Sequence, residues 1–142
     1  MFIDSLLRVA NAQAFGAAAV SASAIDLGAS APKRQIGTGE PMGFGVAVTT
    51  SGTVAPSLIE IISATDAALT AGILVHGSRT VPLAEALAGS LFFVPLPQGT
   101  PTQQYLGVRI TTAGGTISAS AWLTTHDLFS IAQTMYPKNY AV

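Results

Sequence analysis

Two histidines, His76 and His126, are the residues of this sequence best suited to acid–base chemistry. Nucleophilic catalysis needs a serine or threonine beside a histidine base, and a carboxylate that orients the base. His76 ends an apolar stretch and has no acidic residue close to it in sequence. This context is typical of a structural or surface histidine, so we expect no catalytic role for His76.

His126 and Asp127 are adjacent, which places a base and a carboxylate close together in sequence. Neighbouring residues of a strand point to opposite faces, so these two side chains would meet only if the chain turns at this point. The many serines and threonines make chance pairings with a histidine common. The sequence therefore does not support a catalytic triad, and we expect that the protein is not an enzyme.

Metal and cofactor sites have equally little support. The sequence contains no cysteine, and its seven acidic residues stand singly along the chain: Asp4, Asp26, Glu40, Glu60, Asp66, Glu85 and Asp127. Metal sites gather several such ligands. The glycine-rich tract 36–41 lacks the Lys-Ser/Thr ending and the spacing of a phosphate-binding loop. We expect no metal and no cofactor.

The composition indicates a protein that meets partners through uncharged surface. Charged residues make up 9% of the chain, against roughly 25% in typical soluble domains, while 49% of residues are hydrophobic and the net charge is −1. Such a surface has little self-repulsion. Some of its apolar area should be covered by copies of the chain or by another protein. We therefore expect an oligomer or a component of a lattice.

Nucleic acid and membrane are poor partners for this sequence. Lys33 and Arg34 form the only adjacent basic pair, whereas phosphate binding needs clustered cations. A salt contact at the rim of a protein interface is the better interpretation of this pair. Apolar stretches such as 91–96 are far shorter than the ~20 residues that span a bilayer. The stretch 14–24 makes a poor signal peptide, because Asn11 and Gln13 interrupt the apolar region before its end and Asp4 precedes it.

The elements that must carry any interface are mainly strands. Segments of alternating apolar and polar residues are bounded by Gly, Pro and Ser, and this alternation predicts about seven or eight strands. This pattern is typical of an antiparallel sandwich or barrel in one domain, residues 1–142. The expected strands are 20–27, 43–50, 57–65, 69–76, 90–96, 105–112 and 116–124.

Turn residues predict how these strands connect. We expect hairpins between 43–50 and 57–65, and between 105–112 and 116–124. The run that ends 69–76 predicts a strand buried on both faces, followed by a turn at Gly77 and Ser78. Pro95 places the end of 90–96 at an edge or a bulge, and Trp122 is expected to anchor the core from the last strand.

Helices and terminal segments complete the prediction. Residues 82–88 begin with proline and precede Gly89, which predicts a short helix, and 127–136 predicts a second one that Pro137 ends. The sandwich body is expected over 15–125, between an N-terminal arm (1–14) and a C-terminal tail (126–142). The first 14 residues fit an arm, an edge strand or a short helix.

Several blocks of the sequence resemble a known family. LLRVANAQAF, then AIDLG, then PKRQIGTGEPMGF resemble the capsid cement (decoration) proteins of short-tailed Bordetella-type bacteriophages in order and spacing. SLFFVPLP and QYLGVRITTAGGTISASAWL are similar to the later strands of that family, so the resemblance covers most of residues 1–125. The string IGTGEP, between AIDLG and a glycine-rich strand, is the most unusual of these features.

The resemblance implies a jelly-roll-like sandwich on the outer surface of the virion. There it would bind the major capsid protein, bridge capsomers and associate with itself, as a dimer or alternatively a trimer. We expect the contacts to involve the arm and the exposed loops. The candidate partner-binding residues are Phe2, Ile3, Leu6, Leu7, Arg8, Lys33, Arg34, Glu40, Tyr136 and Tyr140.

Three alternatives remain open at this point. The apolar residues of the arm could pack into the chain's own core, because small sandwiches use every available apolar side chain. A jelly roll could also serve as a glycan- or receptor-binding appendage, which would need exposed aromatic faces. A hydrolase on a β-scaffold has the least support, because no histidine and carboxylate constellation is evident.

Overall fold

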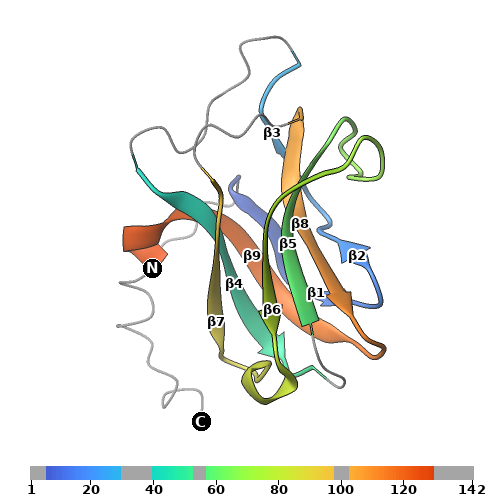
Figure 1. Cartoon of the computed structure of the whole chain (residues 1–142), viewed down its shortest axis with the longest axis vertical. Coiled ribbons are helices and arrows are strands. Elements are labelled where there is room, and N and C mark those ends of the chain that lie inside the picture. The colour runs from blue at the N-terminus through green and yellow to red at the C-terminus, as the bar shows by residue number, and fades with distance from the viewer. Residues whose placement is uncertain (1–5, 30–39, 53–56, 98–102, 130–142) are drawn as a thin grey trace.

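The computed structural model of the chain describes residues 6–29, 40–52, 57–97 and 103–129. These residues form two antiparallel sheets that pack face to face as a sandwich (Figure 1). The prediction of an all-β sandwich is therefore confirmed. No helix in the described ranges is long and apolar enough to cross a membrane.

The two sheets are named A and B here. Sheet A has the order β1 (Arg8–Phe15), β9 (Ile117–Thr125), β4 (Met42–Thr50) and β7 (Leu91–Pro95). Sheet B has the order β2 (Ala19–Val20), β8 (Tyr105–Thr112), β5 (Ser57–Ala64) and β6 (Leu74–Val81), and β3 (Ile25–Asp26) also pairs with β8. Because β2 and β3 share one position beside β8, each sheet has four strand positions, which is the arrangement of a jelly roll.

Both predicted hairpins are wrong. β4 pairs with β7 and β9, whereas β5 pairs with β6 and β8. The chain likewise passes from β8 in sheet B to β9 in sheet A, through a turn in which Gly114 and Gly115 have positive φ. Alternation of apolar and polar residues decides which face of a strand is buried, but it does not decide which strand lies beside it.

The core lies between the two sheets. Alternate side chains of each strand point inward, and the largest fully buried ones include Phe15, Phe44 and Ile61. Small residues such as Ala119 and Ala121 are also fully buried in the same cluster. The core is therefore shared by strands from both ends of the described chain, which ties β1 and β9 into the sandwich.

Two strand predictions need correction. The expected strand 20–27 is split into β2 and β3, two residues each. The expected strand 69–76 is displaced, because β6 begins only at Leu74, and Gly77 and Ser78 lie inside it instead of forming a turn. β6 is also not buried on both faces, since Leu74 and Val75 are 42% and 50% exposed. The physical reason is that β6 has a neighbour, β5, on one side only.

The terminal and helical predictions have mixed outcomes. Residues from Arg8 onward, expected within an arm, form edge strand β1, which was one of the alternatives. The helix expected over 82–88 is a single 3-10 turn, η1 (Leu83–Glu85), because Ala86 has φ −80° and ψ 48°. A helical turn does follow β9 at 126–129, and the remainder of the second expected helix and the tail lies outside the described residues.

Candidate interaction surfaces

Three of the four sheet edges are protected against pairing with another strand. Edge strands present backbone groups that a further strand can bind, and bulges, proline or short length prevent this. β1 has two register shifts, and Ala12 within it has φ 47°. β7 has five residues and ends at Pro95. β2 and β3 have two residues each.

β6 is the unprotected edge among the described strands. It has eight residues and contains no proline, and its one register shift lies opposite Ile61 and Ile62. Most of its side chains are exposed or half-buried. Four apolar side chains are exposed on this strand and just beyond it. Leu74 and Val75 lie at the start of β6, and Leu83 (40%) and Leu87 (55%) lie beyond its end. We call β6 together with Leu83 and Leu87 the β6 edge.

The β6 edge presents little charge. Its single arginine, Arg79, turns toward β7, where its guanidinium carbon lies 5.1 Å from the centre of the Phe92 ring. Arg79 Nη1 also donates a hydrogen bond of 3.4 Å to the backbone oxygen of Phe93. The guanidinium therefore lies over the seam between β6 and β7, and residue 79 stays exposed there.

The histidine of this strand is held in a local hydrogen-bond network. Ser63 Oγ lies 2.6 Å from His76 Nε2 and accepts a hydrogen bond of 2.9 Å from the backbone N–H of Gln103. Because Ser63 is fully buried and its oxygen already accepts from Gln103, its hydroxyl is best satisfied by donating to an unprotonated Nε2 of a neutral His76 ring. Burial lowers the pKa of His76, in agreement with a neutral ring. The arrangement ties β5, β6 and residue 103 together.

A tightly bonded loop, residues 65–73, leads into β6. Asp66 Oδ1 accepts hydrogen bonds from the backbone N–H groups of Thr70 (2.9 Å) and Ala71 (2.7 Å), and Oδ2 accepts one from Thr70 Oγ1 (2.6 Å). These bonds lower the pKa of Asp66. Leu69 at the centre of the loop has φ 57° and is fully buried. The loop therefore covers part of the outer face of sheet B with a single leucine.

The described candidates from the sequence gather at one end of sheet A. Arg8 pairs with Trp122 at the start of β1, and Met42, two residues after the exposed Glu40, pairs with Thr125 at the end of β9. Leu6 is 83% exposed, whereas Leu7 and Arg8 are half-buried and Leu7 packs against the core. The other candidates lie outside the described residues: Phe2, Ile3, Lys33, Arg34, Tyr136 and Tyr140.

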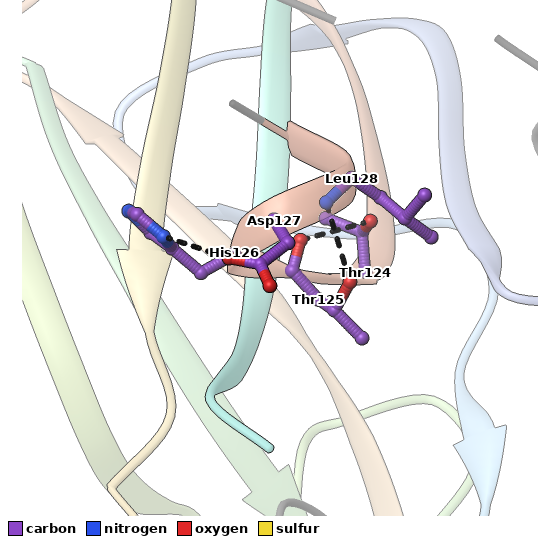
Figure 2. A network of polar contacts seen from close by, with 5 residues as sticks. All are labelled: Thr124, Thr125, His126, Asp127 and Leu128. Carbon is purple, nitrogen blue, oxygen red and sulfur yellow. Dashed lines mark hydrogen bonds and ion pairs between the residues drawn. The ribbon is translucent and has the colours of Figure 1, made fainter. Parts of the chain in front are cut away.

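The same end of sheet A carries the turn that brings His126 and Asp127 together. Figure 2 shows their side chains beside the capping contact of this turn, in which the Leu128 N–H donates to Thr125 Oγ1 at 3.4 Å. His126 Nδ1 lies 3.9 Å from Asp127 Oδ1, and the two side chains are 57% and 86% exposed. Because the Thr125 hydroxyl caps the turn and is not bonded to His126, the three residues lack the geometry of a triad.

The turn folds over the outer face of sheet A. Phe129 is buried there, 5.3 Å from the ring centre of Phe93, which also contacts the His126 ring at 5.2 Å. Gly45 lies beneath: a Cβ there would be 2.9 Å from the indole of Trp122 and 3.1 Å from Phe129. Trp122 is therefore buried on the outer face and not in the core between the sheets, which corrects the sequence prediction.

One ion pair joins two strands of sheet B. Glu60 and Arg109 form an ion pair of 2.7 Å across β5 and β8, and this contact raises the pKa of Arg109. Glu60 and Arg109 are directly opposite each other in the register of β5 and β8, so the pair is an ordinary cross-strand contact. Within the described ranges, no three His, Asp or Glu side chains come close enough to hold a metal ion.

Sequence reasoning missed the β6 edge and the 65–73 loop. The apolar run of residues 73–75 was interpreted as a fully buried strand, although the same run also fits an exposed edge that awaits a partner. The strand 74–81 lacks acidic residues and lysine, but β1 and β7 lack them too, so the composition alone carries no signal that identifies the open edge.

Comparison with known proteins identifies the group to which the sequence belongs. No curated protein matches the chain. The sequence does match the Bbp16 family, a family of Bordetella phage proteins, over residues 9–124. The matched region starts in β1 and ends in β9, so it includes every strand of both sheets. The chain therefore belongs to the Bbp16 family of phage proteins.

Proposed function

We propose that this protein is a capsid decoration, or cement, protein that binds the outer surface of the major capsid protein shell and bridges neighbouring capsomers. Family membership supports a structural role in a phage particle. The observation that carries the finer proposal is the β6 edge, an open strand flanked by exposed Leu74, Val75, Leu83 and Leu87. Such a surface is suited to a protein that functions while covered by another one.

The mechanism is physical and needs no reaction. Each bound subunit adds contact area across a joint between capsomers, and many modest contacts sum over the shell. A subunit that loses one contact stays bound through the others, so the joint stays closed. We accordingly propose no catalytic activity, no cofactor, and no nucleic-acid or membrane partner.

Copies of the chain are proposed to contact each other on the shell as well, as a dimer or alternatively a trimer. The low charge supports this, because neighbouring copies repel each other weakly at a net charge of −1. The end of sheet A with Leu6, Arg8 and Glu40 is one surface available for such contacts, since Leu6 and Glu40 are exposed there.

A glycan-binding appendage receives less support. Glycan platforms need exposed aromatic faces. Trp122 is 4% exposed and Phe129 is 2% exposed, so the aromatic group on the outer face of sheet A is closed. Tyr105 is half-buried beside the residues under the 65–73 loop.

The test is reconstitution on shells that lack this protein. Purified chain is added to expanded shells, the shells are sedimented, and cryo-electron microscopy locates the added density. We expect density on the outer surface across capsomer joints, and a higher temperature of shell rupture. Protein that stays in the supernatant, or that binds only tails, would exclude the decoration role.

A further inference from the structure

We infer that the β6 edge binds an extended segment of the shell protein as an additional strand of sheet B. The inference rests on the proposed function and names the surface and the kind of partner. Strand addition supplies main-chain hydrogen bonds to an exposed sheet edge, and side chains on alternate positions give selectivity. The added strand would lie on the side of β6 away from β5.

The four edges of the sandwich differ in a way that selects β6. Bulges interrupt β1, Pro95 ends the short β7, and β2 and β3 have two residues each. Natural proteins protect edges in these ways against pairing with other chains. β6 has no paired strand on the side away from β5, although the end of β7 packs against it at Gly77, where a Cβ would lie 2.7 Å from the Pro95 oxygen. An edge strand without a partner or a proline is expected to be covered when the protein functions.

The chemistry of the edge describes its partner. The guanidinium of the exposed Arg79 is turned toward Phe92 and the Phe93 carbonyl of β7, and burial lowers the pKa of His76, so residues 74–81 carry one cation and no acid. The exposed Glu85 lies beyond the strand, between Leu83 and Leu87. The partner strand should therefore be largely uncharged opposite residues 74–81. At about 3.3 Å per residue, the eight residues of β6 match a segment of about 26 Å. Apolar side chains at both ends of that segment would cover Leu74 and Val75, and Leu83 and Leu87.

The size of the edge favours the shell over a second copy as the occupant. Stable interfaces in solution use about 20–30 residues on each side, whereas β6 offers eight. Pairing of this edge alone would be weak between two free copies, but it is sufficient on a shell, where other contacts hold the subunit in place. If two copies paired through β6, each strand would also bring its register shift at His76 into the new ladder, so the ladder would be interrupted twice.

The experiment changes the edge and measures shell binding. Val75→Lys and Thr80→Lys are combined, because lysine on a sheet edge opposes an added strand, and both positions are exposed. Ala17→Lys combined with Ala18→Lys is the matched control, since both positions are exposed in the turn between β1 and β2, and β2 lies at the opposite edge of sheet B from β6. We expect the edge variant to bind shells on the order of tenfold more weakly and the control to bind like wild type.

Hydrogen exchange on the wild-type protein gives a second measurement that does not depend on the variant folding. On shells, the amides of residues 74–81 should exchange more slowly than in free protein, because an added strand accepts their hydrogen bonds. Unchanged exchange there, or an edge variant that binds shells like wild type, would overturn the inference while the decoration role stands.

Two other outcomes test whether the occupant is a second copy and whether the proposed function holds. If the edge variant loses self-association in solution but still binds shells, the occupant of the edge is a second copy and the inference is wrong. If wild-type protein fails to bind shells at all, the proposed function fails and the inference falls with it.

Discussion

The outer faces of the two sheets are each covered by one large apolar side chain, but the two segments that carry these side chains are held differently. On sheet A, Phe129 of the 126–129 turn lies over Gly45. On sheet B, Leu69 of the 65–73 loop lies over Gly107, where any Cβ would collide with the leucine Cδ1. In both places glycine leaves the space that one large apolar side chain fills (Figure 1 shows the loop before β6 and the turn after β9).

The two covers differ in their attachment to the sandwich. The 65–73 loop joins β5 to β6 at both ends, and Asp66 holds it with three hydrogen bonds. The 126–129 turn follows β9, and its hydrogen bonds are fewer: the Leu128 N–H donates to Thr125 Oγ1 at 3.4 Å, and the His126 N–H donates to the Pro41 carbonyl at 2.9 Å. The loop should therefore be part of the cooperative fold, whereas the turn should open locally.

The largest expected effect is at the leucine of the loop. Leu69→Ala should lower the free energy of unfolding by about 3 kcal/mol, because it removes a fully buried side chain above Gly107 and leaves a cavity. Urea denaturation measures the change, with exposed Leu128→Ala as a control that should stay within about 0.5 kcal/mol of wild type. A loss below about 1 kcal/mol for Leu69→Ala would mean that the loop is not part of the cooperative fold.

A smaller effect on global stability is expected at the phenylalanine of the turn. Phe129 is as buried as Leu69, but local opening of the turn limits its contribution, and Phe129→Ala should lower stability by about 1–2 kcal/mol. The change should instead be clear in the fluorescence of Trp122, the only tryptophan, which loses its cover and shifts to longer wavelength. A loss equal to that of Leu69→Ala, without a spectral shift, would remove the difference between the two covers.

Acid should weaken the loop before the turn. The hydrogen bonds to Asp66 hold its pKa below the usual 3.8, so the folded state binds fewer protons than the unfolded state near that pH. The resulting stability is present above about pH 3.8 and is lost as the pH falls through the lower folded pKa. Asp66→Asn should therefore flatten the pH dependence of the urea midpoint below pH 4. Parallel curves for wild type and variant would contradict this assignment.

Much of the fold could be predicted from the sequence, because alternation and turn residues act locally. The positions of β4, β5, β8 and β9 agree with the expected strands within a residue or two, and Pro95 did mark an edge. The pairing of these strands could not be predicted, since a jelly roll joins strands that are distant in the chain and the alternation is the same for either partner.

The covers and the open edge were also beyond prediction, for different reasons. Leu69 has a positive φ that leucine rarely adopts, and the hydrogen bonds that Asp66 accepts hold the loop around it. Trp122 faces outward because Gly45 provides space on that face, which depends on a neighbour in another strand. Exposure of Leu74 and Val75 follows from the edge position of β6, a property of the whole sheet.

The smallest expected effect separates the cap of the turn from its aromatic contacts. Thr125→Ala removes the oxygen that accepts the Leu128 N–H, and at 3.4 Å this bond is long, so the loss should be about 0.5 kcal/mol, at the low end for caps. Thr125→Ser keeps the oxygen and should restore most of the stability. If Thr125→Ala instead shifts Trp122 fluorescence as far as Phe129→Ala does, the cap and not the ring stacking holds the turn on sheet A, and the two covers are both held by hydrogen bonds.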